Sequence, residues 1–166
     1  INNNTGFITA TNATTLKTTN GGINWLIIDS TADSYYTDLK FTDSLTAYIC
    51  GYNYITSSAF IRKTTNGGYN WFTQTLNSSL IMTNIHFVNN NTGFTSSNSS
   101  GQNFFKTTNG GTNWTAVGNY NNPIEDIYFV NENIGYLCGF FGWFYRTTNG
   151  GLNWSQITVP AQNNIR

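Results

Sequence analysis

The residues of this chain that could carry acid–base chemistry are few and unevenly spread. Seven Asp and Glu, seven Lys and Arg and one His stand among 166 residues. A glycosidase needs two carboxyl groups about 5 to 10 Å apart at the scissile bond. The segment from Phe72 to Trp114 holds no Asp or Glu, and all the carboxylates lie outside it: Asp29, Asp33, Asp38, Asp43, Glu125, Asp126 and Glu132. We predict no catalytic residue, with glycoside hydrolysis as the alternative.

Metal ligands and nucleophiles are equally sparse. His86 is the only His, and Cys50 and Cys138 occupy equivalent positions of a repeated pattern. Equivalent positions fall in separate sheets, so we expect no disulfide, which needs Cα atoms within about 7 Å. The spacing of the first three aspartates does not match a calcium loop, which leaves a loose surface calcium site as the alternative. We predict no metal and no cofactor.

The polar side chains that recur at fixed spacing are a threonine, an asparagine and a tryptophan around two glycines. The pattern Lys-Thr-Thr-Asn-Gly-Gly-x-Asn-Trp begins at Lys17, Lys63 and Lys106, and at Arg146 with Arg in place of Lys. Asn-Gly favours a tight hairpin turn, in which the hydroxyl and the amide can bond backbone groups and the indole can cover the hairpin. We predict a structural role for the following residues: Thr18, Asn20, Gly22, Trp25, Thr64, Asn66, Gly68, Trp71, Thr107, Asn109, Gly111, Trp114, Thr147, Asn149, Gly151 and Trp154.

The intervals between these turns define the elements that must hold them. The four tryptophans of the pattern lie 46, 43 and 40 residues apart, the length of one four-stranded propeller blade. Each full interval starts with alternating apolar residues such as Leu39 and Phe41, followed by a polar turn, a second strand and a third strand. The third strand enters the Asn-Gly-Gly turn, and we expect Asn-Trp to begin a fourth strand. No helical period is sustained, so the sequence predicts an all-β fold.

The repeated turn resembles the Asp-box, or BNR, repeat, whose usual form is Ser/Thr-x-Asp-x-Gly-x-Thr-Trp. Asn20, Asn66, Asn109 and Asn149 stand where that family has Asp. The segments of the type Phe-Val-Asn-x-Asn-x-Gly-Tyr also resemble blades of the Ycf48 group and of bacterial secreted propellers. The resemblance covers nearly the whole chain and implies a β-propeller of about four four-stranded blades. It implies little about function, because Asp-box propellers include glycosidases, lectin-like binders and assembly factors.

Sialidases are one enzyme class within this resemblance, and they grip a carboxylate with three arginines. The arginines here are Arg62, Arg146 and Arg166. Arg146 occupies the position that Lys holds in the other repeats, which indicates a structural cation. We therefore exclude a sialidase site.

We predict a single propeller domain over residues 1–166, with repeats at about 1–25, 26–71, 72–114 and 115–154. Residues 155–166 would begin the strand that residue 1 ends. The four blades would then close into a ring, or the chain would form part of a larger propeller. The first residue, Ile1, indicates a mature product or a fragment. Self-association of copies to complete a ring is a third possibility.

Composition limits the partners. Only 8% of residues are charged and the net charge is zero, which excludes a basic nucleic-acid binder and a polybasic membrane clamp. No apolar run approaches the roughly 20 residues that span a bilayer, and no signal peptide is recognisable. The 27 Asn and 26 Thr are typical of a β-rich extracellular protein, although an A/T-rich codon bias also raises Asn. We expect a secreted or cell-surface protein, of bacterial origin.

Recognition is expected in the loops between second and third strands, which vary while the Asn-Gly-Gly turns hardly do. Variable loops on a rigid scaffold are where binding residues concentrate. We predict ligand contacts at Tyr52, Tyr54 and Trp143, unless these aromatic rings only fill space between blades. The predicted function is a non-catalytic interaction module that binds a protein or a glycan. The alternatives are a lectin-like propeller, an assembly factor and a fragment of a glycoside hydrolase.

Overall fold

The computed structural model describes residues 4–10, 12–76, 79–99, 101, 103–118, 120, 122–139 and 142–158. Strands dominate these residues, and the prediction of an all-β fold is confirmed. No helix in these ranges is long and apolar enough to cross a membrane. The chain divides into two compact units, residues 1–85 and residues 86–166.

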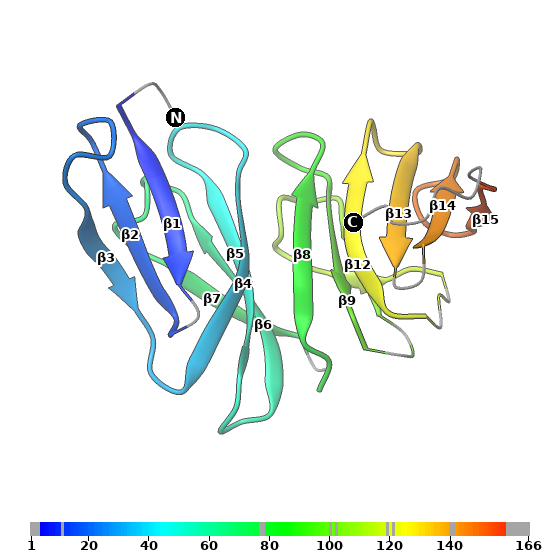
Figure 1. Cartoon of the computed structure of the whole chain (residues 1–166), viewed down its shortest axis with the longest axis horizontal. Coiled ribbons are helices and arrows are strands. Elements are labelled where there is room, and N and C mark those ends of the chain that lie inside the picture. The colour runs from blue at the N-terminus through cyan, green and yellow to red at the C-terminus, as the bar shows by residue number, and fades with distance from the viewer. Residues whose placement is uncertain are drawn as a thin grey trace. The chain divides into compact units, whose positions relative to one another are not determined.

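The first unit holds two antiparallel sheets, each a meander of sequential strands (Figure 1). The first sheet has three described strands: β1 (Gly6–Ala10), β2 (Thr14–Thr18) and β3 (Leu26–Ser30). The second sheet has four: β4 (Ser34–Phe41), β5 (Ala47–Asn53), β6 (Ser58–Thr64) and β7 (Phe72–Leu76). A buried cluster of Ala13, Tyr36, Ile49 and Phe60 forms its core, with Leu39 and Trp71 packed against it.

The second unit is organised in the same way. Its sheets consist of β8 (Met82–Phe87), β9 (Gly93–Ser97), β10 (Phe104–Thr107) and β11 (Thr115–Ala116), then β12 (Ile124–Phe129), β13 (Gly135–Gly139), β14 (Trp143–Thr147) and β15 (Ser155–Gln156). Strand β8 begins in the first unit, before the division at residue 85. The core contains Phe94, Phe104, Phe129 and Leu137 among its buried residues.

Two details differ from the sequence prediction. The strand that follows each Asn-Gly-Gly turn begins at the residue after the tryptophan, for example β3 at Leu26 and β7 at Phe72, and not at Asn-Trp. The cause is the indole, which folds back onto the turn instead of entering the strand. The sheets therefore end beyond the repeat boundaries drawn at the tryptophans. The predicted closing strand was placed in residues 155–166 and at residue 1. Of these, Ser155–Gln156 form β15, which pairs with β14. Residues 1–3 and 159–166 lie outside the described residues.

Irregular pairing decides which side chains face the core of the first unit. In β4 the register shifts between Tyr36 and Asp38, so that Tyr35 pairs with Tyr52 and Tyr36 with Gly51. This β-bulge at Thr37 turns Tyr36 inward, where it is buried, and leaves Tyr35 half-exposed on the other face. The register between β2 and β3 also shifts, which places Asp29 opposite Thr15.

Candidate functional site

The four Asn-Gly-Gly turns share one hydrogen-bond pattern. In the second sheet, Gly68 N donates to Thr64 Oγ1 at 3.0 Å and Asn70 N donates to Asn66 Oδ1 at 2.9 Å. Trp71 Nε1 donates to Gly68 O at 3.1 Å, which holds the indole against the turn. The same hydroxyl and amide bonds recur around Thr18 and Asn20, Thr107 and Asn109, and Thr147 and Asn149.

The turns differ in the indole hydrogen bond and agree in their backbone conformation. Trp25 Nε1 donates to Gly22 O, whereas no hydrogen-bond partner of Trp114 Nε1 or Trp154 Nε1 is found among the described residues. Both glycines carry positive φ, for example 70° at Gly67 and 90° at Gly68, while the asparagines do not. The asparagine is therefore needed for its side-chain oxygen and the glycines for their conformational freedom. The polar groups of these turns point into the hairpins, an arrangement suited to structure rather than to a ligand.

The loop between β5 and β6 is held rigidly by its own side chains. Asn53 Oδ1 accepts from Ile55 N at 3.1 Å and from Thr56 N at 2.8 Å, and Tyr54 N donates to Asp33 O at 3.0 Å. These bonds fix an Asx turn, a motif in which an Asn side chain replaces a backbone acceptor. The loop therefore presents its outer side chains in one conformation.

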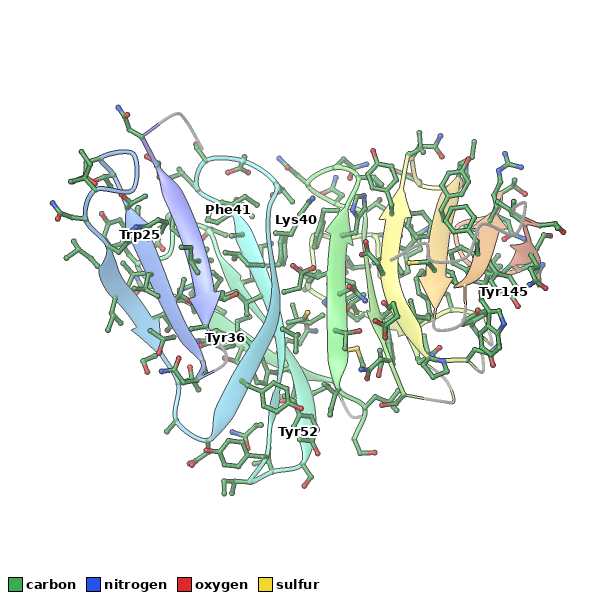
Figure 2. The ribbon with its side chains drawn as sticks, viewed as in Figure 1. Trp25, Tyr36, Lys40, Phe41, Tyr52 and Tyr145 are labelled. Carbon is green, nitrogen blue, oxygen red and sulfur yellow. The ribbon has the colours of Figure 1, made fainter. Side chains whose placement is uncertain are left out.

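Aromatic and apolar groups gather at this end of the hairpin. Figure 2 shows Tyr52 there, and the rings of Tyr35 and Tyr52 lie 5.8 Å apart. Tyr54 is 54% exposed and Ile55 is 69% exposed. We call Tyr35, Tyr52, Tyr54 and Ile55 the tyrosine loop. Tyr35 and Ile55 were not predicted as site residues, because their place beside Tyr52 depends on the bulge and on the Asx turn.

A cavity of about 220 Å³ opens beside the tyrosine loop. Its lining is mostly hydroxyl and amide groups: Thr31, Ser34, Asn53, Thr56, Ser58, Phe60, Arg62, Thr73 and Thr75. Such a lining offers many hydrogen-bond donors and acceptors around one aromatic ring. It suits a neutral, hydroxyl-rich ligand.

The one cation in this cavity is already paired. Arg62 forms an ion pair with Asp29, in which Nη2 donates to Oδ1 at 3.0 Å, and its Nη1 also donates to the Tyr36 hydroxyl. The Tyr36 hydroxyl donates to Asp29 Oδ2 at 2.5 Å, and burial together with this carboxylate raises the pKa of Tyr36 to about 12. The positive charge is thereby compensated, so the cavity holds no free charge for an anionic ligand.

Most carboxylates have structural partners. Asp38 Oδ1 accepts from Leu39 N and Asp126 Oδ1 from Ile127 N, both at 2.8 Å. Asp43 accepts from two backbone amides of its turn, and these bonds hold the pKa of the Asp43 carboxyl below its usual range. Glu132 accepts from Asn89 and Thr92. Among the described residues no group of three or more His, Cys, Asp or Glu could hold a metal ion.

The histidine and the two cysteines are the remaining side chains that could act as metal ligands or nucleophiles. His86 Nε2 lies 3.0 Å from Phe129 O. Both cysteines are free, and burial raises the pKa of the Cys50 thiol to about 12. Burial also raises the pKa of Cys138. Both thiols therefore stay protonated at neutral pH and are poor nucleophiles.

The predicted ligand residues do not form one cluster within either unit. Tyr52 and Tyr54 belong to the first unit, whereas Trp143 begins β14 in the second unit, opposite Gly139. Trp143 is partly buried. Its neighbours Phe140 and Phe141 lie outside the described residues. The tyrosine loop and its cavity are therefore the best-formed candidate site.

Comparison with known proteins bears on the fold. No protein-family model matches this chain, and no curated protein sequence is similar to it. An ancestral GH74 enzyme is 21% identical with a TM-score of 0.75, over 97% of this chain and 24% of that one. Ycf48 from Cyanidioschyzon merolae is 18% identical with a TM-score of 0.68, and the match covers 92% of this chain and 52% of that one. Ycf48 bound to a D1 peptide is 22% identical with a TM-score of 0.62, and the match covers 75% of this chain and 41% of that one.

The sheets are blades of a β-propeller. The chain spans about a quarter to a half of the length of these similar structures. At such low identity the likeness bears on the fold alone, and a shared fold does not determine function.

Proposed function

We propose that this chain is a non-catalytic binding module whose ligand contacts the tyrosine loop. The observation that carries the proposal is the gathering of exposed Tyr54 and Ile55 beside the Tyr35–Tyr52 pair on a loop fixed by Asn53. Exposed aromatic side chains on a rigid support supply contact area at a small cost in conformational entropy.

A protein segment is the proposed ligand. A similar structure, Ycf48, is bound to a D1 peptide, which supports a peptide-binding role for a propeller of this kind. An assembly-factor role would be one form of this function. Ycf48 and this chain share too little identity to carry over the D1 peptide itself.

A glycan is the second candidate, and the cavity favours it. The hydroxyl and amide lining around Phe60 matches the polar edges and apolar faces of a sugar. A neutral glycan also suits the compensated charge of Arg62. The ligand would then enter the cavity instead of lying across the loop.

The test is selection of ligands on the intact chain. We would select random peptides by phage display, screen a glycan array, and measure the affinity of each hit by calorimetry. Binding through the tyrosine loop should be lost in the double variant Tyr52→Ala/Tyr54→Ala. Tyr128→Ala, which alters a 59% exposed tyrosine elsewhere, is the matched control. Hits that bind the double variant as well as the unaltered chain would rule the loop out.

A catalytic role is not part of this proposal, although one of the similar structures is a GH74 enzyme. The carboxylates with described hydrogen bonds are used within turns and between strands, which supports binding rather than hydrolysis. A screen against β-glucans and xyloglucan is the direct check. Turnover that disappears in Asp126→Asn or Glu125→Gln would replace the binding module with a hydrolase.

We further propose that the protein is secreted or cell-surface, on the basis of its uncharged, Asn- and Thr-rich composition. Fractionation of producing cells, with an antibody against the chain, tests this. Detection in the cytosol alone would contradict it.

We also infer that copies of the chain associate with one another. The support is that Ile8 and Ile27 of the first sheet are exposed and Phe144 of the last sheet is partly exposed. This association is independent of the tyrosine loop.

A further inference from the structure

Equivalent positions in different sheets have very different exposure. Phe144 in β14 is partly exposed, whereas its counterparts Thr15 and Phe104 are 0% and 1% exposed. Ile8 in β1 is 48% exposed, whereas its counterparts Ile49 and Leu137 are 0% and 1% exposed. Residue type does not explain this, since all six side chains can pack in an interior. The first and last sheets each expose a face that is covered at the equivalent positions of other sheets.

The exposed face of the last sheet is aromatic, with one cation at its edge. Tyr136 pairs across the strands with Arg146, and the rings of Tyr136 and Phe144 stack at 6.0 Å. Tyr136, Cys138 and Phe144 line a cavity of about 220 Å³ on this face. We call Tyr136, Cys138, Phe144 and Arg146 the trailing face.

The exposed face of the first sheet is aliphatic. Ile8 pairs with Leu16 and Leu16 pairs with Ile27, so the three side chains share one face. Ile27 is 68% exposed, and Ile23 in the adjacent Asn-Gly-Gly turn is 81% exposed. We call Ile8, Leu16, Ile27 and the turn at 21–23 the leading face.

The glycines of the turn give an independent sign of a missing neighbour. Gly67 and Gly68 are buried, as are the glycine pairs at 110–111 and 150–151, whereas the pair at 21–22 is exposed. All four turns have the same hydrogen bond from the second glycine N to the threonine hydroxyl. The difference therefore lies outside the turn, in what packs on it.

The first unit shows how one sheet covers the next sheet's turn. Phe7 and Lys17 are a cross-strand pair, and Lys17 Nζ donates to Gly67 O of the second sheet at 3.0 Å. The same ammonium lies 4.6 Å from the centre of the Tyr69 ring, and the Phe7 ring lies 4.3 Å from that of Phe41.

The second unit repeats this contact. Phe94 and Lys106 are a cross-strand pair, and Lys106 Nζ donates to Glu132 O of the following sheet at 3.2 Å. The Phe94 ring stacks on Phe129 at 3.6 Å. A Cβ on Gly150 would lie 2.8 Å from Lys106 Nζ, so this cation also reaches the next turn. In both units, therefore, an aromatic ring and a cation on one sheet contact the following sheet.

We propose that copies of this chain bind head to tail, with the trailing face of one copy on the leading face of the next. The inference rests on the proposed self-association and assigns its surfaces. Arg146 takes the part of Lys17, and its guanidinium donates to Gly21 O of the second copy, the counterpart of Gly67 O. The rings of Tyr136 and Phe144 cover Ile8, Leu16 and Ile27 of that copy. Arg146 is exposed, so its guanidinium is accessible to a second copy.

Such a contact is heterologous, because two different surfaces meet. A substitution on either face therefore blocks one side of each copy and leaves the other side intact. Ile8→Asp removes the leading face, and Phe144→Asp removes the trailing face. A mixture of these two variants should therefore still form a dimer, through the intact trailing face of one copy and the intact leading face of the other.

Sedimentation velocity on the 166-residue chain tests the proposal, over about 1 to 200 μM, a range that detects interfaces of ordinary size. We expect the weight-average mass to rise with concentration. Ile8→Asp, Phe144→Asp and Arg146→Glu should each weaken association at least about tenfold. An equimolar mixture of Ile8→Asp and Phe144→Asp should form a one-to-one dimer and nothing larger. Leu45→Asp, at a 55% exposed position in the turn between β4 and β5, is the control and should associate normally.

Each outcome decides one question. A chain that stays monomeric over the whole range overturns both the self-association and its surfaces. Association that persists unchanged in the face variants overturns the assigned surfaces and leaves self-association standing. Circular dichroism separates lost association from lost folding, and Arg146→Glu alters an exposed side chain that the fold does not use. Alkylation of Cys138 should also slow as concentration rises, and an unchanged rate would contradict its place on the trailing face.

Discussion

The two sheets of the second unit carry the same pattern on the same face and bury it differently. Phe94 and Phe104 in sheet β8–β11 are 0% and 1% exposed, whereas Tyr136 and Phe144 in sheet β12–β15 are partly exposed. The first pair packs on the following sheet, with the Phe94 ring 3.6 Å from Phe129. The second pair stacks only within its own sheet, at 6.0 Å.

This difference teaches that burial in a repeat protein is a property of the neighbour. Each repeat carries its own hydrophobic face, and the stability of that face depends on the interface it makes. A repeat pattern in a sequence predicts that the face exists. It does not predict whether a given copy of the face is covered.

The largest expected effect is the difference between Phe104→Ala and Phe144→Ala. Phe104 contacts Trp154 edge to face at 5.5 Å and lies in the core, so its removal should cost about 3 to 5 kcal/mol. Phe144→Ala should cost about 1 kcal/mol or less in the monomer, because its ring is partly hydrated already. Urea unfolding at low protein concentration measures both. Equal costs would mean that the last sheet is as well packed as the third.

The next largest effect is expected at alkaline pH, where ionisation of Cys50 should lower the stability of the fold more than ionisation of Cys138 does. Burial raises the pKa of the Cys50 thiol from 9.0 to about 12. Cys138 is half-exposed, and burial raises the pKa of its thiol by a smaller amount. Stability is then unaffected below pH 9, where both folded and unfolded thiols are protonated. It falls between pH 9 and 12, because only the unfolded thiol ionises there, by on the order of 2 kcal/mol at pH 11.

The matched variants are Cys50→Ala and Cys138→Ala, each unfolded in urea at pH 8 and pH 11. Cys50→Ala should reduce the loss of stability between the two pH values more than Cys138→Ala does. Burial also raises the pKa of Tyr36 and Tyr48 to about 12, so a residual loss remains in both variants. An identical pH dependence in the two variants would mean that coverage of the cysteine position does not matter.

The repeated turns are accessible to prediction from sequence, because the interactions that shape them are local. The hydroxyl of Thr64 and the amide of Asn66 act within four residues, and two adjacent glycines supply the required φ. The start of the fourth strand was misplaced by two residues, since Trp71 bonds back to Gly68 O and the strand begins only at Phe72.

The site was harder to predict, because it depends on a bulge. Counting back from the pair Phe41 and Ala47 without a bulge would place Tyr36 opposite Tyr52. The bulge at Thr37 shifts this register, so Tyr35 takes that position and Tyr36 turns inward to Arg62. The sequence signals no bulge there. Tyr52 and Tyr54 were therefore predicted, but the ring beside Tyr52 and the cavity with Arg62 were not.

The cations of the two sheets should differ by a smaller amount. Lys106 Nζ donates to Glu132 O and lies 5.2 Å from the Phe94 ring, so Lys106→Met should cost about 1 kcal/mol. Arg146 is exposed, and Arg146→Met should leave the monomer within about 0.5 kcal/mol. Thermal unfolding at low concentration compares them. A larger cost at Arg146 would show that it serves its own sheet.

The smallest difference in stability is expected between equivalent asparagines of two turns, and this comparison is the control for the other predictions. Asn109 and Asn149 make the same bonds, each accepting from a backbone amide at 2.9 Å and from a threonine hydroxyl at 3.0 Å. Alanine at either position should cost about 1 to 2 kcal/mol, and the two costs should agree. Aspartate at either position keeps the accepting oxygen and should cost close to nothing. If Asn149→Ala costs much less than Asn109→Ala in urea unfolding, the last sheet is loose as a whole, and its exposed face then reflects poor folding rather than a missing neighbour.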